Sequence, residues 1–337
     1  MARSKVEKVE KAEKLAVRVG RVAIVGRPNV GKSTLLNALL GEAISITSHH
    51  PQTTRDRVLG VLTEKDAQYV FLDTPGVHRA RTKLGARMNQ EARDAARDAD
   101  VILFMTEPQR AVNLPGFRAS DLALLKELPS GIPIILALNK IDRIHDKTTL
   151  FSVLEAHAKA FEFACIIPIS AKRRDGLDFV KKEIKDRLPK HPAGEPLPFE
   201  DDALTDRPVR YLVAEFVREQ ILRRTREEVP HGIAVVVDHF DDTQKVPRIE
   251  VSIHVDKEAH KKIVIGKAGS LLKEIGTLAR TKVERLLGVH VHLQLWVRVT
   301  PGWYESDSQL KDLGYGSTAR ASDKMSSTGK AGPKKKT

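Results

Sequence analysis

The sequence is poor in cysteine and in aromatic residues, and it has no long apolar run. It contains one cysteine and 5% Phe, Trp and Tyr in 337 residues. A single cysteine excludes an intramolecular disulfide and a CxxC metal site. No apolar stretch approaches the roughly 18 residues of a membrane-spanning helix, and the N-terminus lacks the apolar segment of a signal peptide. We therefore expect a soluble protein of the cytoplasm.

Positive charge exceeds negative charge, with a formal net charge of +13. Residues 1–18 carry six basic and three acidic side chains, and residues 317–337 carry six basic and one acidic. Most of the excess therefore lies in two end segments, which are typically solvated and poorly ordered. The net charge alone is thus weak evidence for a nucleic-acid partner.

The first half of the chain alternates strands with helices, and several of the strands are apolar throughout. This pattern predicts an α/β domain with a mostly parallel sheet that is covered on both faces. The expected strands are 21–26, 57–63, 67–73, 101–105, 132–138 and 165–170, and the expected helices are 32–41, 81–98, 119–127, 147–163 and 176–188.

A second domain follows a stretch, residues 189–208, that holds five prolines and five carboxylates. Such a composition is typical of a linker. Beyond it, the order helix–strand–strand–helix–helix–strand predicts a small α+β domain with a three-stranded sheet. The expected elements are 208–228, 232–240, 247–255, 258–264, 269–287 and 289–299. We expect a basic extension (1–18), a nucleotide-binding domain (19–190), a linker (191–207), the α+β domain (208–316) and a disordered basic tail (317–337).

The strongest motif is GRPNVGKS (26–33), which fits the P-loop pattern G-x-x-x-x-G-K-[ST] and lies between a strand and a helix. Backbone N–H groups would surround phosphate oxygens at the helix N-terminus. Lys32 would contact the β- and γ-phosphates, and Ser33 would bind Mg²⁺. The predicted phosphate-binding residues are Gly26, Arg27, Pro28, Asn29, Val30, Gly31, Lys32, Ser33 and Thr34.

Three later motifs favour GTP over ATP. In NKID (139–142), the Asp142 carboxylate would accept hydrogen bonds from guanine N1 and N2, a donor pair that adenine lacks. In DTPG (73–76), the aspartate would hold the Mg²⁺ shell and the glycine amide would sense the γ-phosphate. In SAK (170–172), the Ala171 amide would face guanine O6. All of these motifs follow strands, where open α/β sheets bind ligands. The predicted residues are Asp73, Thr74, Pro75, Gly76, Asn139, Lys140, Asp142, Ser170, Ala171 and Lys172.

Together these motifs resemble the translation-factor-like branch of Ras-fold GTPases, and in particular the Era family. By this resemblance PQTTRDR (51–57) is the effector loop, and Thr54 senses Mg²⁺ and the γ-phosphate, with Thr53 as a second candidate. The expected Mg²⁺ ligands are then Ser33, Thr54 and Asp73, and the expected catalytic residues are Lys32, Thr54, Gly76 and Asn29. The other hydroxyls of this region, Ser45, Thr47 and Ser48, are expected to be solvated loop residues.

The sequence predicts a slow intrinsic reaction. Val77 stands where Ras-type enzymes carry the glutamine that positions the attacking water. Asn29 stands where related P-loops of the form GxPNxGKS bind a K⁺ ion that replaces an arginine finger. The alternative is that Asn29 only stabilises the loop.

The second domain carries GKAG (266–269) between two expected helices, as the GxxG turn of a KH domain requires. The element order resembles the type II arrangement. Residues 257–285 hold eight basic side chains and three glutamates, and the arginines of the preceding helix, at 218, 223, 224 and 226, could share that face. Trp296, Trp303 and Tyr304 could stack bases, or they could pack the last strand. The predicted RNA-binding residues are Ile265, Gly266, Lys267, Ala268, Gly269 and Lys273.

The resemblance spans residues 20–316 and implies a Ras-like P-loop GTPase domain with a six-stranded sheet, followed by a type II KH domain. It implies a monomer that uses GTP and Mg²⁺, binds 16S rRNA near its 3′ end, and assists 30S subunit assembly as a nucleotide-controlled switch. Family members also contact the inner face of the cell membrane peripherally. Residues 77–98 and the linker are the expected coupling elements. The alternatives are a signalling switch whose KH-like domain docks a protein or a membrane, and an ATP-dependent enzyme.

Overall fold

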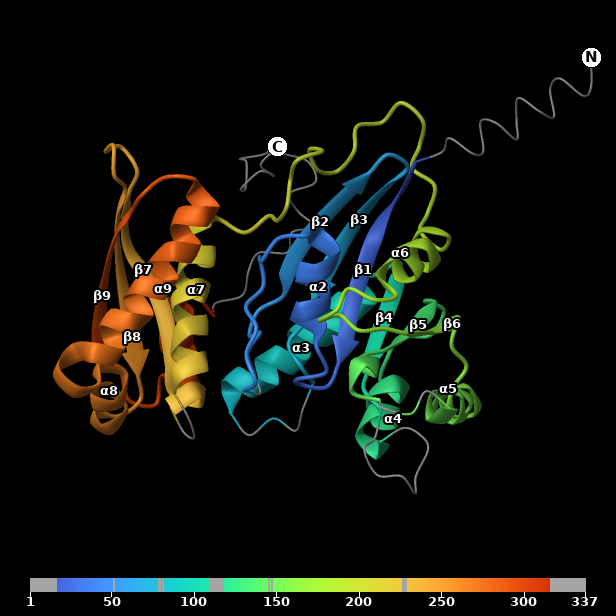
Figure 1. Ribbon diagram of the computed structural model, residues 1–337, viewed down its shortest axis with the longest axis horizontal. Coiled ribbons are helices and arrows are strands. Elements are labelled where there is room, and N and C mark those ends of the chain that lie inside the picture. Colours follow the sequence, from blue (N-terminus) through green and yellow to red (C-terminus); the bar gives the residue numbers. More distant parts are fainter. Residues whose placement is uncertain are drawn as a thin grey trace, which may run out of the picture.

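The computed structural model describes residues 17–315, except for residues 51, 78–79, 81, 109–117, 145, 147 and 226–228. The predicted extension and tail therefore lie almost entirely outside the described residues. The chain forms one six-stranded and one three-stranded sheet. Figure 1 shows them side by side, with the three-stranded sheet on the left and helix α7 (Val209–Arg224) between the two.

The larger sheet has the order β2-β3-β1-β4-β5-β6, and only the β2–β3 pair is antiparallel. This confirms the expected six-stranded, mostly parallel sheet. Its strands are β1 (Arg18–Gly26), β2 (Val58–Glu64), β3 (Ala67–Asp73), β4 (Val101–Thr106), β5 (Ile134–Leu138) and β6 (Cys165–Pro168). Cys165 of β6 is only half-buried, because β6 is an edge strand.

Helices cover both faces of this sheet because side chains alternate along its central strands. Val22 and Ile24 of β1 pack with α2 and α6, whereas Ala23 and Val25 pack with α3 and α4. The helices are α2 (Lys32–Leu40), α3 (Lys83–Arg97), α4 (Ala119–Lys126), α5 (Thr148–Ala160) and α6 (Leu177–Lys185). The helices therefore cover the faces of the sheet, and the P-loop, NKID and SAK segments follow the carboxyl ends of its strands.

The proline-rich linker is packed rather than free along part of its length. Leu204 is 4% exposed and belongs to the core cluster of the larger domain. Its carbonyl accepts a hydrogen bond from the Val61 amide at 2.9 Å, and the Thr205 hydroxyl donates to Leu59 O at 2.6 Å. The chain thus lies along β2 before it enters α7.

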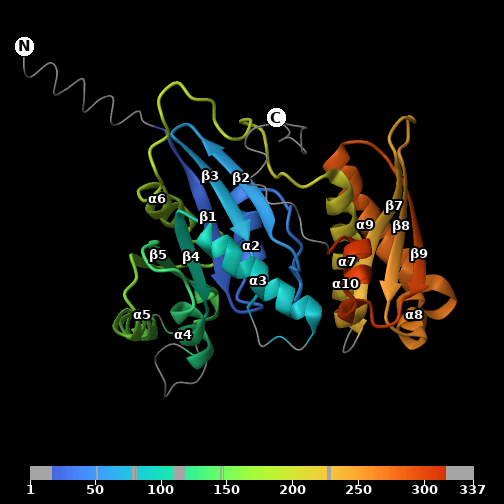
Figure 2. The ribbon, with the colours of Figure 1, turned by 180° about the vertical axis from the view of Figure 1, so that it is seen from behind.

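The second domain has the order α7, β7 (Ile233–Asp241), β8 (Arg248–Val255), α8 (Glu258–Ile265), α9 (Ser270–Leu287) and β9 (His292–Val299). β7 and β8 are antiparallel, and β8 and β9 are parallel. This confirms the α-β-β-α-α-β arrangement of a type II KH domain, with the first helix shorter than expected. Short helical turns follow, including α10 (Asp307–Leu310), which is labelled in the reverse view of Figure 2. Among the described residues, no helix combines the length and apolar character needed to cross a membrane.

The two tryptophans have different environments. Trp303 is fully buried, and its indole N–H donates to Gly232 O at 3.1 Å. Trp296 of β9 is 50% exposed, so of the two alternatives for this residue the structure does not support packing inside the domain. Strand alternation explains this, since Leu295 and Val297 on either side of Trp296 join the core instead.

Candidate nucleotide site and RNA-binding surface

The P-loop leads into a helix whose first backbone N–H groups have no side-chain cap and can bind an anion. Helix α2 begins at Lys32 without a side-chain cap and without an acidic residue in its first turn. Uncapped N–H groups and the helix dipole favour phosphate at this position. Gly31 is held at φ 106°, and a Cβ there would lie 2.3 Å from the Asn139 amide nitrogen. A glycine is therefore required where the base-binding segment approaches the phosphate loop.

The Lys32 ammonium is buried against the backbone of its own loop. Its Nζ donates to the carbonyls of Gly26 and Arg27, each at 3.1 Å. Burial lowers the pKa of Lys32 to about 8, although the nearby Asp73 carboxylate acts in the opposite direction. A phosphate would supply this cation with the counter-charge that the loop carbonyls only partly provide.

Oxygen atoms suited to Mg²⁺ converge beside this lysine. The Ser33 hydroxyl donates to Asp73 Oδ2 at 2.7 Å and lies 2.8 Å from the Thr54 hydroxyl oxygen. Asp73 is fully buried, its pKa is raised by that burial, and its Oδ1 has no hydrogen-bond partner among the described residues. A buried, unpartnered carboxylate oxygen next to two hydroxyls fits a hard divalent cation.

The two threonines of the effector loop point in different directions. Thr54 faces Ser33, whereas the Thr53 hydroxyl donates to His50 O at 2.7 Å and lies 2.6 Å from Ser48 Oγ. This geometry favours Thr54 as the Mg²⁺-sensing residue. Ser45, expected to be solvated, is 5% exposed and donates to Asp73 Oδ2 at 2.8 Å. That expectation is wrong because the segment after α2 folds back onto the end of β3.

The base-binding segments are preorganised by hydrogen bonds to one another. Ser170 donates to Asp142 at 2.7 Å, and this bond holds the pKa of the Asp142 carboxyl below its usual range. The Asn139 amide donates to Val30 O at 2.8 Å, while its oxygen accepts the Ala171 amide at 2.9 Å. The Ala171 N–H thus bonds Asn139 here. Lys140 donates to Asn29 O at 2.6 Å, which links the NKID segment to the P-loop.

Three other predicted positions have contacts of their own. The Arg27 side chain leaves the phosphate site and pairs with the buried Asp121 at 2.5 Å, so only its backbone faces a nucleotide. The Asn29 amide donates to His49 O at 2.9 Å. Val77 packs against the apolar cluster under α3 and α4. A side chain in that cluster cannot position a water molecule.

The GKAG turn connects α8 to α9 at the surface of the KH domain. Gly266 has φ 73°, and a Cβ there would lie 2.7 Å from Leu271 Cβ. Lys267 and Ala268 are exposed, as is Lys273 on the first turns of α9. This turn therefore presents its backbone and its lysines to solvent.

Apolar and basic side chains surround the GKAG turn. Ile263 and Leu278 are 47% and 36% exposed on the same pair of helices. Four lysines near the turn form no ion pair with another described residue: Lys261, Lys262, Lys267 and Lys273. Such a combination at a GxxG turn suits a single-stranded nucleic acid.

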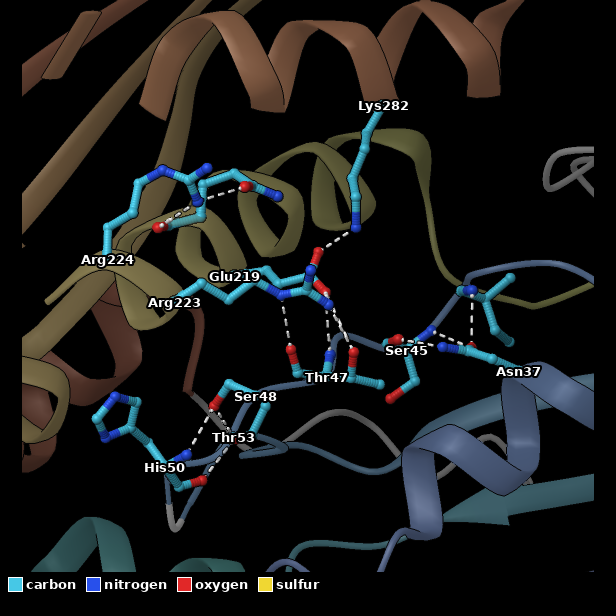
Figure 3. Close-up of polar contacts among 12 residues, drawn as sticks. Asn37, Ser45, Thr47, Ser48, His50, Thr53, Glu219, Arg223, Arg224 and Lys282 are labelled. Atoms are coloured by element: carbon cyan, nitrogen blue, oxygen red, sulfur yellow. Dashed lines mark hydrogen bonds and ion pairs between the residues drawn. The ribbon is translucent and has the colours of Figure 1, made fainter. Parts of the chain in front are cut away.

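Two of the α7 arginines that could have shared this face, Arg218 and Arg223, do not join the basic surface. Figure 3 shows Arg223 reaching Thr47, to which its Nη2 donates at 2.9 Å. Arg218 is 1% exposed and donates to Thr53 O, and Arg224 pairs with Glu274 at 2.8 Å. Arg226 lies outside the described residues. Because α7 faces the larger domain, Arg218 binds the effector loop and Arg223 binds the segment just before it.

These features define a GTP-binding switch domain joined to a KH domain. Residues 21–140 match the family model of 50S ribosome-binding GTPases, and residues 228–304 match that of KH domains. GTPase Era of Ruminiclostridium cellulolyticum is 42% identical over 89% of this chain and 98% of the relative, and that of Geobacter sp. strain M21 is 44% identical over 88% and 98%. The chain belongs to the Era family of GTPases.

Two solved structures are similar over nearly the same span. A crystal structure of Era in complex with MgGDPNP and nucleotides 1506–1542 of 16S ribosomal RNA is 43% identical, with a TM-score of 0.83 over 89% of this chain and 99% of that chain. The crystal structure of a single-substitution variant of Aquifex aeolicus Era bound to GDP·AlF4⁻ is also 43% identical, with a TM-score of 0.82 over 89% and 100%.

Proposed function

We propose that this protein binds and hydrolyses GTP, binds 16S rRNA near its 3′ end, and assists 30S subunit assembly as a nucleotide-controlled switch. The observation that carries the proposal is the presence, in one chain, of the Asp73-centred nucleotide site and the exposed GKAG turn. The similarity to the Era–RNA complex supports the same pairing of partners.

The site explains how hydrolysis would proceed. The α2 N-terminus and Lys32 would bind the phosphates, and the oxygens of Ser33, Thr54 and Asp73 would hold Mg²⁺. Bound Mg²⁺ would neutralise charge that develops on the phosphate oxygens. The Gly76 amide would contact the γ-phosphate, and the Asp142 carboxylate would select guanine. Since Val77 is apolar and packs against the cluster under α3 and α4, it cannot order the attacking water, and the intrinsic rate should be slow.

A salt-titrated binding assay with RNA of nucleotides 1506–1542 tests the RNA partner. The double substitution Lys267→Asp, Ala268→Asp places two carboxylates where the phosphate backbone would approach. We expect RNA affinity to fall by about tenfold or more, while GTP hydrolysis without RNA stays unchanged. Unchanged RNA affinity would instead support a KH-like domain that docks a protein or a membrane. Displacement of GTP by equimolar ATP would support an ATP-dependent enzyme.

We also propose that the protein acts as a monomer in the cytoplasm, where its rRNA partner is found. Peripheral contact with the inner face of the membrane stays a prediction. The segments expected to make that contact, 1–18 and 317–337, lie almost entirely outside the described residues.

A further inference from the structure

Two consecutive residues of the effector loop make their side-chain contacts in different domains. The Thr54 hydroxyl lies 2.8 Å from Ser33 Oγ in the nucleotide site. The next side chain, Arg55, is 3% exposed and is inserted into the KH domain. Since consecutive Cα atoms are about 3.8 Å apart, Thr54 cannot move several ångströms without moving Arg55.

The Arg55 guanidinium occupies a pocket made by both ends of the KH domain. It donates to Pro230 O at 3.1 Å and to Ile233 O, both next to the start of β7. Its Cζ lies 5.5 Å from the Trp303 ring centroid and 5.9 Å from that of Tyr315. Carbonyl oxygens and aromatic faces are the groups that stabilise a buried guanidinium. The pocket is therefore specific for an arginine.

The KH domain holds the residue before Thr54 as well. The buried Arg218 of α7 donates to Thr53 O and pairs with Glu215 at 2.6 Å. Just before the effector loop, the Thr47 backbone amide donates to Glu219 at 3.2 Å (Figure 3). Thr54 thus lies in a segment that α7 and the Arg55 pocket hold on both sides.

The same pocket contacts the helix that follows DTPG. Leu84 and Met88 of α3 form one apolar cluster with Trp303 and Tyr315. Lys83, at the start of α3, pairs with Asp307 at 2.6 Å. Both loops that surround a γ-phosphate in this fold therefore lead to the Trp303–Tyr315 end of the KH domain.

The pocket is also continuous with the helix that precedes GKAG. Trp303 donates to Gly232 O, and a Cβ on Gly232 would lie 3.1 Å from Cβ of Asp256 and 3.7 Å from Nδ1 of His260. His260 lies in α8, which ends directly before Gly266. Displacement of Arg55 would thus affect residues packed against α8.

We propose that Arg55 is a positioning residue through which the KH domain holds Thr54 at the Mg²⁺ and γ-phosphate site. The inference rests on the proposed function, because it assumes a GTPase whose KH domain binds RNA. Release of the loop after hydrolysis withdraws the guanidinium from its pocket, and loss of the pocket releases Thr54. By thermodynamic linkage, if a nucleotide changes the affinity of the KH domain for RNA by some factor, RNA changes the affinity for that nucleotide by the same factor.

The first experiment compares Arg55→Ala and Arg55→Lys with Arg57→Ala in the full chain. Arg57 is a matched control, since its guanidinium pairs with Asp98 of the GTPase domain at 3.5 Å. We expect Arg55→Ala to weaken MgGDPNP binding by about fivefold or more and to lower kcat by about tenfold, with MgGDP affinity unchanged. Arg57→Ala should change none of these. Arg55→Lys keeps the charge but not the forked donors, and it should show the same loss. It therefore tests the inference even if Arg55→Ala fails to fold.

The decisive comparison is between the two nucleotides. An equal loss of GDP and GDPNP affinity in both Arg55 variants would indicate a merely structural role and overturn the inference. Unchanged GDPNP affinity and unchanged kcat would overturn it too.

A second readout uses the RNA of nucleotides 1506–1542. In the unmodified chain, RNA affinity should differ between the GDPNP and GDP states by about fivefold or more, and Arg55→Ala should bring that ratio close to one. A ratio retained in Arg55→Ala would overturn the inference while leaving the proposed function standing. Absence of RNA binding by the unmodified chain would overturn the proposed function, and the nucleotide measurements would still decide the role of Arg55.

Discussion

Glu219 of α7 accepts hydrogen bonds from the backbone amide and the hydroxyl of Thr47 at 3.2 and 3.4 Å, although 172 residues separate the two in sequence. The carboxylate is 2% exposed and also pairs with Arg223 and Lys282. One buried anion therefore joins the segment before the effector loop to two helices of the KH domain.

Glu219→Gln should destabilise the protein, because a neutral amide leaves two cations without their buried counter-charge. We expect the free energy of unfolding, measured in urea, to fall by about 1–3 kcal/mol. Glu274→Gln is the control, since its pair with Arg224 is partly exposed and should contribute about 0.5 kcal/mol or less. Equal effects of the two substitutions would contradict this account of Glu219.

The two tryptophans should differ in their importance for stability. Trp303→Ala removes a fully buried ring and its bond to Gly232, and should cost about 3–5 kcal/mol. Trp296→Ala removes a half-exposed ring and should cost about 1 kcal/mol. Thermal and urea unfolding would measure both. A larger loss for Trp296→Ala would mean that the outer face of β9 is covered by something else in solution.

Asn29 should make GTP turnover dependent on K⁺. Its side-chain oxygen is the atom able to bind a cation next to the phosphates, while its nitrogen is bonded to His49 O. We expect turnover in KCl to exceed turnover in NaCl by about tenfold, a small part of the roughly 10³-fold that an arginine finger supplies. Asn29→Ala should remove the difference. Equal rates in both salts for the unmodified chain would leave Asn29 as a loop-stabilising residue.

Asp142 should determine base selectivity. Asp142→Asn replaces an acceptor oxygen with a donor, which faces the guanine 2-amino group unfavourably and the 2-carbonyl of xanthine favourably. We expect GTP affinity to fall by about 100-fold or more and xanthosine triphosphate to bind in its place, as competition binding would show. Asp146→Asn, at an exposed carboxylate bonded to Thr148, should leave both affinities unchanged.

Lys267 should contact the RNA backbone without reading bases. Lys267→Ala is expected to reduce the slope of log affinity against log salt by about one and to weaken different single-stranded RNAs alike. Arg224→Ala is the control, because that guanidinium is paired with Glu274 and bonded to Gln220. The assignment fails if the slope is unchanged in Lys267→Ala, or if it changes equally in the control.

The nucleotide site could be predicted closely from the sequence because each of its motifs is one short, continuous segment. The P-loop, DTPG, NKID and SAK each lie at the end of one strand, so the parallel sheet brings them together once the strands are known. The same holds for GKAG, which needs only the two helices on either side. The sequence leaves the choice between Thr53 and Thr54 open, because only the path of the folded loop shows which hydroxyl faces Ser33.

Contacts between the domains could not be predicted in this way. Arg55, Arg218 and Arg223 have polar side chains that favour solvent when only their own segment is considered. Each is bonded to a partner far along the chain, such as Arg55 to Pro230 and Arg218 to Thr53. Nothing in their spacing indicates those partners. The low exposed fraction of Arg55 and Arg218 is visible only in the folded chain.

The shared apolar cluster of Leu84, Met88, Trp303 and Tyr315 has a consequence for how the chain melts. An isolated KH domain would expose the side of Trp303 and Tyr315 that α3 covers, and would be prone to self-association. Ile46, which lies between α2 and the effector loop, likewise completes the KH core. The two domains should therefore unfold in a single cooperative transition, and guanine nucleotide should raise the melting temperature of both together.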